Sequence, residues 1–260
     1  MKSQVTLNPI VFLWTAPRSL STVFEKSVAQ LEGVRTFHEP FSKVYYGERR
    51  GPEFTDKHGV SSFEQVVNDL IDTARRETVF VKELAYCARG CKDFKRFEWF
   101  FRDMCTHTFL IRDPQETVPS LSAQMKKVYG PDIDFGEIAD SSGVKKLAKM
   151  YDNAVAWGQV PPVVDASCLT EHPSKVLQMY CARAGLKYSE KMLQWKEGIL
   201  PDWTTWSQYG WHDQVEKTTT FVKPQSTYEE ELADPRVSRL IIYLEPYYFD
   251  LRDKRLSCTE

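Results

Sequence analysis

The sequence predicts an α/β protein with three layers, in which helices cover both faces of a four- to five-stranded parallel sheet. Two observations carry this prediction. Short apolar segments typical of buried strands alternate with segments of helical periodicity. Polar residues follow the apolar segments at the points where the strands would end, which is where parallel sheets bind ligands. No internal repeat or low-complexity linker interrupts the alternation, so we expect a single domain over residues 1–260.

Five short segments predict the strands of this sheet. Residues 9–15 (PIVFLWT) are apolar almost throughout, as in a strand that is buried on both faces. The other four segments are short and contain β-branched or aromatic residues, which are enriched in strands. These are residues 33–38 (GVRTFH), 78–83 (TVFVKE), 106–112 (THTFLIR) and 161–166 (PPVVDA).

Helices are predicted between and after these strands. Apolar residues recur at helical spacing over residues 20–31. In residues 61–75, a glutamate three positions after Ser61 forms a capping-box pattern. Residues 173–185 begin with proline and end with glycine, the usual asymmetry of helix ends. The remaining helices are expected at residues 115–127, 142–157 and 236–249, and Pro246 should disturb the last turns of the final one.

Composition and charge limit the class of protein. Hydrophobic residues make up 42% and charged residues 27% of the chain, as in a globular protein. The formal net charge of −2 argues against long-range attraction to nucleic acid or to an anionic membrane. No segment approaches the roughly 20 apolar residues that cross a bilayer, and no signal-peptide pattern is present at the amino terminus. We therefore expect a cytoplasmic protein without nucleic-acid or membrane partners; no pattern indicates its oligomeric state.

The six cysteines are scattered along the chain. None forms a CxxC pair, and none is grouped with histidine at the spacing of a zinc site. We expect them to be buried, reduced thiols and we expect no metal site. They are Cys87, Cys91, Cys105, Cys168, Cys181 and Cys258.

The turn between the first strand and the first helix predicts an anion site. Residues 15–22 read TAPRSLST, a P-loop-like strand–turn–helix. A helix start presents free backbone N–H groups and the positive end of the helix dipole. Arg18 and the hydroxyls of Ser19, Ser21 and Thr22 add to this attraction. The turn contains neither the glycines nor the GK[ST] ending of a Walker A motif, so it differs from the site of a nucleotide kinase.

A second motif, FLIRDPQETVPS (residues 109–120), ends a predicted strand at Arg112 and carries Ser120 eight positions further on. The two motifs, in this order and each at a strand end, resemble those of the sulfotransferases that use 3′-phosphoadenosine 5′-phosphosulfate (PAPS). The stretch over residues 162–186 is similar to the later strand–loop–helix of that family. The resemblance covers roughly residues 9–186.

The resemblance implies transfer of a sulfuryl group from PAPS to a small-molecule acceptor, in line and without a metal, leaving the product PAP. Arg18 would stabilise the charge that develops on the bridging oxygen. Arg112 and Ser120 would bind the 3′-phosphate. Leu20 stands where the family often has glycine, so its backbone must accommodate a side chain. The 5′-phosphate would be bound by the turn, through Ser19, Leu20, Ser21 and Thr22.

The acceptor must lose a proton, and three residues near strand ends could serve as its general base. They are Glu39, His38 and Glu83, in that order of preference. Some branches of the family place a catalytic glutamate just after the second strand, which favours Glu39. Lys82 resembles a lysine of that branch and would contact the sulfate. The choice among the three bases stays open at this point.

Other interpretations also stay open. A small-molecule or nucleotide kinase would bind ATP with magnesium, and a non-catalytic relative would bind the nucleotide alone. The acceptor would be selected by residues 43–60 and 187–225, which carry no recognisable code. Acidic residues such as Glu48, Glu53 and Asp56 would suit a cationic acceptor. We expect the tryptophans of the second segment to pack in the core or a lid, or to stack on adenine or the acceptor: Trp195, Trp203, Trp206 and Trp211.

Overall fold

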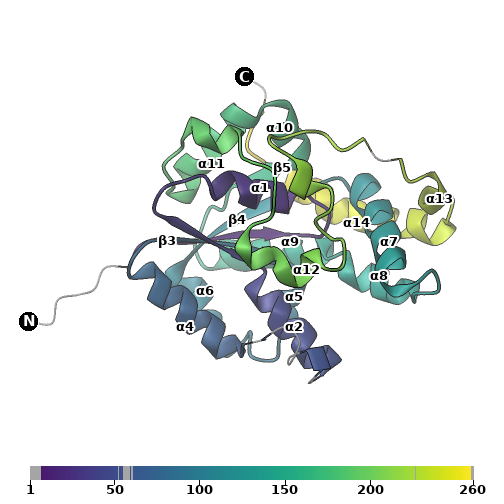
Figure 1. The fold of residues 1–260 in the computed structure, drawn as a ribbon, viewed down its shortest axis with the longest axis horizontal. Helices are drawn as coiled ribbons and strands as arrows, with labels where there is room; N and C mark the ends of the chain where they lie inside the picture. Colours follow the sequence, from purple (N-terminus) through teal and green to yellow (C-terminus); the bar gives the residue numbers. More distant parts are fainter. Residues whose placement is uncertain (1–6, 52, 55–58, 60, 226, 259–260) are drawn as a thin grey trace, which may run out of the picture.

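Five parallel strands form the centre of the computed structural model, which describes residues 7–51, 53–54, 59, 61–225 and 227–258. The strand order is β2-β3-β1-β4-β5, and every neighbouring pair is parallel (Figure 1). The strands are β1 (Ile10–Thr15), β2 (Val34–His38), β3 (Thr78–Leu84), β4 (Cys105–Ile111) and β5 (Val163–Asp165). The predicted α/β fold with a five-stranded parallel sheet is confirmed.

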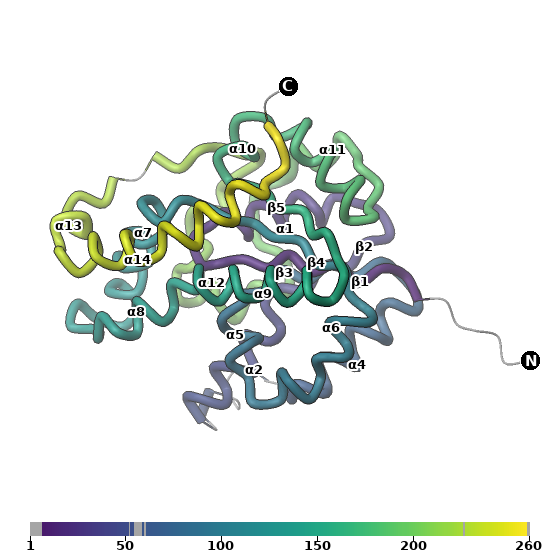
Figure 2. The backbone as a smooth tube through the Cα atoms, turned by 180° about the vertical axis from the view of Figure 1, so that it is seen from behind, coloured from purple at the N-terminus to yellow at the C-terminus, as the bar shows by residue number. Residues whose placement is uncertain are grey.

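Each face of the sheet packs against its own layer of helices. Successive side chains of a strand point to opposite faces. Phe12 and Trp14 of β1 therefore join one hydrophobic core, and Val11 and Leu13 join the other. One face is covered by α2 (Pro40–Arg50), α4 (Phe63–Ala74), α5 (Ala85–Gly90), α6 (Glu98–Met104), α9 (Val144–Ala156) and α14 (Pro235–Arg252), of which α9 and α14 are best seen in Figure 2. The other face is covered by α1 (Ser21–Val28), α10 (Ala166–Glu171) and α11 (Pro173–Ala184).

The remaining elements lie around the carboxyl ends of the strands. The helix α7 (Pro114–Tyr129) follows β4 and packs against α14. The segment between α11 and α14 is loop-rich, as expected, and its described residues form only short helices: η1 (Glu190–Leu193), η2 (Pro201–Trp203), α12 (Thr204–Ser207), η3 (Val215–Lys217) and α13 (Glu229–Leu232). A further short helix, α8 (Phe135–Ser141), follows α7.

Two predictions about helix α4 and helix α14 need correction. The cap of α4 is Ser62 rather than Ser61, because the Ser62 side chain accepts a hydrogen bond from the Gln65 backbone N–H. Pro246 does not end α14, which continues to Arg252. Ile242, four residues before Pro246, is 66% exposed, so water can reach the carbonyl that the proline leaves without a donor.

The expectation of six reduced thiols is wrong for one pair of cysteines. Cys168 of α10 and Cys258 form a disulfide across a sequence separation of 90 residues. They meet because the end of the chain runs beside β5, where the Leu256 N–H donates to the Val163 carbonyl at 2.8 Å. This proximity comes from tertiary structure and leaves no spacing pattern in the sequence. The other four cysteines are buried free thiols. The cysteines therefore do not argue for a reducing compartment.

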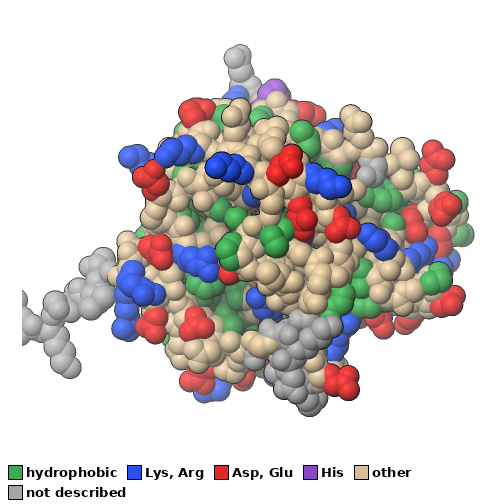
Figure 3. Space-filling model, in the orientation of Figure 1, with side chains coloured by type: hydrophobic (Ala, Val, Ile, Leu, Met, Phe, Trp, Pro, Cys, Tyr) green, Lys and Arg blue, Asp and Glu red, His purple; other side chains and the backbone are tan. Residues whose placement is uncertain are grey.

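Charge is distributed without a single dominant sign on the face drawn in Figure 3, where Lys and Arg side chains are interspersed with Asp and Glu. In the part of the chain that the structure describes, no helix is both long and apolar enough to cross a membrane.

Candidate active site

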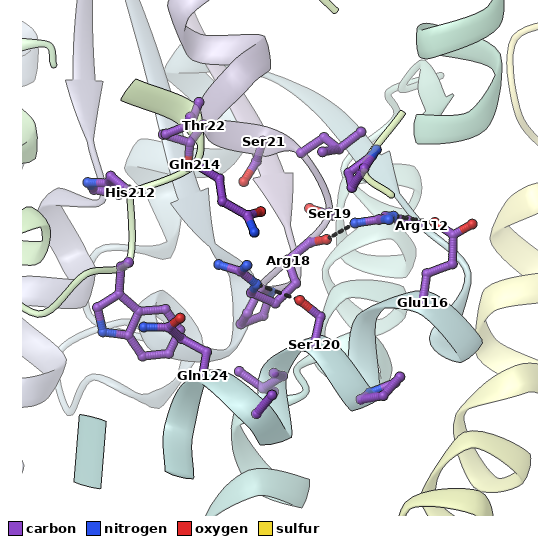
Figure 4. A pocket seen from close by; sticks show the side chains of 18 of the residues that line it. Arg18, Ser19, Ser21, Thr22, Arg112, Glu116, Ser120, Gln124, His212 and Gln214 are labelled. Atoms are coloured by element: carbon purple, nitrogen blue, oxygen red, sulfur yellow. Dashed lines mark hydrogen bonds and ion pairs between the residues drawn. The ribbon is translucent and has the colours of Figure 1, made fainter. Parts of the chain in front are cut away.

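A cavity of about 1110 Å³ lies at the carboxyl ends of the strands. It is lined by the turn at residues 17–23, by residues of strand ends, by the inner side of α7 and by parts of the segment 206–232. Cavities that hold one drug-sized molecule usually measure about 300–1,000 Å³. The space is therefore sufficient for a nucleotide together with a second small molecule. Figure 4 shows the part of this cavity next to the turn.

The turn between β1 and α1 is held in an unusual backbone conformation. Arg18 (φ 64°) and Leu20 (φ 67°) are both left-handed, a conformation that L-residues other than glycine rarely adopt. The Ser19 side chain is fully buried and donates to the Ala16 carbonyl at 2.7 Å, while it also bonds the Thr15 hydroxyl. Ser19 therefore supports the turn from within.

The first turn of α1 is open to a ligand. Leu20 occupies the N-cap position and provides no side-chain cap, so the first N–H groups of the helix lack the usual partner. The side chains of Ser21 and Thr22 line the cavity beside these N–H groups (Figure 4). This arrangement suits a bound anion.

Arg18 points into the cavity from the turn and meets Ser120 of α7. Its Nε donates to the Ser120 Oγ at 2.9 Å, and the Tyr228 hydroxyl donates to the same oxygen at 3.0 Å. Burial lowers the pKa of Arg18 from its ordinary value of 12.5, but a guanidinium keeps its charge in proteins. Among the ion pairs of the described residues, Arg18 takes part in none. Its charge is thus available to a ligand.

Arg112, at the end of β4, joins the same cluster. Its Nη1 donates to the backbone carbonyl of Arg18 at 2.9 Å, and its Nε donates to Glu116 at 2.5 Å (Figure 4). The structure therefore brings Arg18, Arg112 and Ser120 together, although Ser120 is 102 positions from Arg18 in the sequence.

Glu39 and Lys82 form a second cluster at the ends of β2 and β3. Both side chains line the cavity and are ion-paired with each other, and the Glu39 N–H donates to the Lys82 carbonyl at 2.8 Å. Glu39 is also left-handed (φ 50°) and stands at the N-cap of α2. This conformation directs the chain away from the sheet into α2 and leaves the carboxylate at the cavity.

His38 lies behind Glu39 and is not among the residues that line the cavity. Its Nδ1 is 2.5 Å from the carboxylate of Glu25 on α1, and its Nε2 is 3.8 Å from Glu39. Both side chains of the Glu25–His38 pair are fully buried. Burial raises the pKa of Glu25 to about 8 and lowers that of His38 to about 3, so both are neutral near pH 7. A buried histidine in this position does not reach a molecule in the cavity.

Glu83 has a structural role at the start of α2. It is fully buried, and its carboxylate accepts the backbone N–H groups of Phe41, Ser42 and Leu84 together with the Ser42 hydroxyl. Burial raises its pKa to about 8. Its oxygens are occupied by donors of the backbone and it does not line the cavity, so it is poorly placed as a base.

The tryptophans divide between two roles. Trp195 and Trp203 pack in the hydrophobic core, as expected. Trp206 and Trp211 line the cavity instead. Tyr46 and Tyr86, which the sequence did not single out, line it as well. They follow Glu39 and Lys82 by a few residues on α2 and α5, and their proximity to those residues was the signal that could have identified them.

Residues 215–218, here called the roof segment, are hydrogen-bonded to helix α1. Lys26, 3% exposed, donates to the backbone carbonyls of Val215 (3.1 Å), Glu216 (3.3 Å) and Thr218 (3.2 Å). Val215 and Thr218 line the cavity.

In the described residues, no three His, Cys, Asp or Glu side chains gather into a group that could hold a metal ion.

The chain matches the model of the sulfotransferase domain family over residues 10–251. It belongs to this family. Three solved structures share the sulfotransferase fold with it. They are the sulfotransferase domain of the Synechococcus PCC 7002 olefin synthase (14% identity, TM-score 0.55, 94% of this chain and 98% of that one), that of the curacin biosynthetic pathway (15%, 0.53, 92% and 98%), and a sulfotransferase from Alicyclobacillus acidocaldarius (13%, 0.51, 95% and 100%).

Two curated relatives of this sulfotransferase family member come from Arabidopsis thaliana. They are branched-chain-amino-acid aminotransferase-like protein 2 (26% identity over 224 residues) and protein 1 (28% over 223 residues). Each alignment covers 83% of this chain and 37% of the relative. The chain thus spans little more than a third of the length of these two proteins.

Proposed function

We propose that this protein transfers a sulfuryl group from PAPS to a hydroxyl or amine of a small molecule and releases PAP. The observation that carries this proposal is the joining of Arg18, Arg112 and Ser120 into one hydrogen-bonded cluster at the start of α1. The cluster shares a cavity with the Glu39–Lys82 pair. In this proposal, the site for the two phosphates would lie beside a carboxylate that can take a proton.

The residues of the cavity fit the donor in charge and in hydrogen-bonding capacity. The N–H groups of the first turn of α1, with Ser21 and Thr22, would hold the 5′-phosphate. Ser19 and Leu20 would act through the backbone, since the Ser19 hydroxyl is engaged inside the turn. Arg112 and Ser120 would hold the 3′-phosphate, with Glu116 releasing part of its bond to Arg112 as the phosphate enters.

The transfer step requires charge stabilisation and removal of one proton. PAPS supplies the sulfuryl group when it is bound. Glu39 would accept the proton of the acceptor as the acceptor atom bonds to sulfur. The bond between sulfur and the bridging oxygen breaks, and its electron pair stays with the phosphate of PAP. Arg18 would stabilise the charge on that oxygen, and Lys82 would contact the sulfate. In this proposal, these cations and N–H groups would supply the stabilisation without a metal ion.

The decisive experiment is calorimetric titration of the protein with PAP in EDTA, beside a titration with ATP and magnesium. We expect metal-free binding of PAP. Arg112→Ala should weaken it by about 10- to 150-fold, because hydrogen bonds to charged groups contribute about 1.5–3 kcal/mol. Arg102→Ala is the matched control, since Arg102 is an exposed arginine that pairs with Asp103.

A transfer assay with radiolabelled PAPS completes the test. Binding of ATP with magnesium in place of PAP would overturn the proposal and favour a kinase. Binding of PAP with no detectable transfer to any acceptor would point to a non-catalytic nucleotide-binding relative. In that case Glu39→Gln would not change the result of the transfer assay with any acceptor.

A further inference from the structure

The end of the cavity near Glu39 has an aromatic wall, formed by Tyr46 of α2, Tyr86 of α5 and Trp206 of α12. The Tyr46 and Tyr86 hydroxyls bond each other at 2.7 Å, and the Trp206 ring meets Tyr46 edge-on at 5.5 Å between centroids. Burial raises the pKa of Tyr46 well above 10, and the nearby Glu39 carboxylate adds to this shift. The wall therefore stands next to the carboxylate that we assign as the base.

The wall has few polar groups. The two tyrosine hydroxyls share one hydrogen bond, which leaves one O–H donor between them, and the Trp206 Nε1 is buried without a partner among the described residues. A sugar would need several polar partners here to replace its bonds with water. A flat ring, by contrast, gains contact with aromatic side chains at centroid distances of about 4.5–7 Å.

The charges of the cavity oppose a cationic acceptor. Four acidic side chains of the described residues line it, and one of them, Glu229, is on α13, which lies apart from α2 (Figures 1 and 2). The other three are ion-paired with cations that also line the cavity: Glu39 with Lys82, Glu116 with Arg112, and Asp213 with Lys127. An ammonium ion at the aromatic wall would meet Lys82 and Arg18 without a carboxylate of its own.

We propose that the acceptor is an uncharged phenol, whose ring packs against Tyr46, Tyr86 and Trp206 and whose hydroxyl faces Glu39. This inference rests on the proposed sulfuryl transfer and narrows it to ring hydroxyls. A phenol loses its proton with a pKa of about 10, as tyrosine does, and the cations nearby favour the phenolate. An ammonium group has no lone pair until it is deprotonated. In the transfer, the phenol O–H proton moves to Glu39, the phenol oxygen bonds to sulfur, and the bridging oxygen leaves with PAP.

A set of matched probes tests the acceptor class. 4-Ethylphenol and tyramine share the ring hydroxyl and differ by a positive charge, whereas phenethylamine has only the amine and cyclohexanol has a hydroxyl without the aromatic ring. With PAPS as donor, we expect kcat/KM for 4-ethylphenol to exceed that for each of the others by at least about tenfold. Tyramine and phenethylamine would bury a charge without a partner, and cyclohexanol lacks both the ring contact and the acidity of a phenol. An equal or higher value for tyramine, phenethylamine or cyclohexanol would overturn the proposal.

A binding measurement gives a second readout that does not depend on turnover. In the presence of PAP, 4-ethylphenol should bind to the wild-type protein by calorimetry, and Trp206→Leu should weaken this binding about tenfold while it leaves the affinity for PAP unchanged. Trp99→Leu is the matched control, because Trp99 is on α6 and is 43% exposed. The affinity of Tyr46→Phe for 4-ethylphenol should stay within about threefold of wild type, because this variant keeps the ring. It tests the wall by a second substitution, in case the Trp206 variant does not fold.

The outcomes separate the two proposals. If PAP binds and 4-ethylphenol neither binds nor accepts the sulfuryl group, the acceptor proposal is wrong and the proposed transfer stands. If PAP does not bind to the folded protein, the proposed function itself fails, and the acceptor proposal fails with it.

Discussion

The two ends of the cavity are built in opposite ways. The nucleotide end consists of one tight turn, Arg18 to Thr22, joined by hydrogen bonds to β4 and α7. The acceptor end is assembled from α2, α5 and α12, whose contributions lie far apart in the sequence. The first end presents N–H groups and cations, whereas the second presents rings and one paired carboxylate. In the proposed function, a compact motif would bind the nucleotide that every reaction of the site shares, and side chains from distant segments would select the acceptor.

The largest effect that we expect from this difference is that of Glu39→Gln, which should impair catalysis at the acceptor end and leave nucleotide binding intact. We expect kcat to fall by about 10²–10⁴, the usual contribution of a general base, with the affinity for PAP within about threefold of wild type. Transfer from PAPS to 4-ethylphenol and calorimetry with PAP measure the two quantities. Glu64→Gln on α4 is the matched surface control. A variant with normal turnover would remove Glu39 from the mechanism.

Arg18→Ala should impair the nucleotide end of the cavity, where Arg18 would stabilise the leaving group. Removing a cation that stabilises the leaving oxygen should lower kcat by about 10²–10³. Arg18→Lys should recover part of the rate, because the charge returns but the bond from Nε to Ser120 does not. Single-turnover measurements with PAPS separate this effect from binding. Equal rates for the alanine and lysine variants would contradict an electrostatic role for Arg18.

The buried Glu25–His38 pair lies behind Glu39, outside the cavity. It predicts that the stability of the protein depends on pH. Burial raises the pKa of Glu25 to about 8, so the folded protein keeps a proton that the unfolded chain loses above its ordinary value of 4.5. The contribution of this group to stability is therefore present below pH 4.5 and is lost as the pH rises to about 8. Glu25→Gln should gain stability relative to wild type over this window, by up to about 1.4 kcal/mol per pH unit.

Urea unfolding at pH 5, 6, 7 and 8 checks this prediction, with the exposed Glu64→Gln as control. A difference in the free energy of unfolding that does not change with pH would show that Glu25 is ionised in the folded protein.

The smallest expected effect concerns the backbone of the turn. Leu20→Val places a β-branched residue at φ 67° and should destabilise the protein by about 1–2 kcal/mol. Leu193→Val is the control, because Leu193 is also partly buried but its φ is not positive. The free energy of unfolding in urea compares the two variants. Equal losses would show that the left-handed conformation at residue 20 is not retained in solution.

The strands and the nucleotide end could be predicted because their signals are local. The apolar stretch before Pro17 identifies β1, and the residues at its end act within a few positions of one another. Arg112 and Ser120 belong to one short motif. These features depend on neighbours in the sequence, which the sequence displays directly.

The acceptor end could be predicted only in part. Glu39, Lys82 and the two segments that contain Tyr46 and Trp206 follow from the sequence, but the contacts between these segments do not. Tyr46 and Trp206 are 160 positions apart and meet only in the folded chain. Glu25 and Lys26 occupy positions of α1 that would read as a solvated charged face, yet both are buried against groups from β2 and η3. The helices α2 and α5 were not predicted for a related reason. Their helical structure depends more on packing against the sheet than on a periodic pattern in the sequence.

The three hydrogen bonds of Lys26 have a mechanical consequence. One ammonium group fastens the roof segment at residues 215–218 to the helix that would bind the nucleotide. Lifting that segment would break three hydrogen bonds and leave a buried charge without partners. We therefore expect residues 215–218 and helix α1 to move together, and molecules to enter and leave the cavity past a different edge.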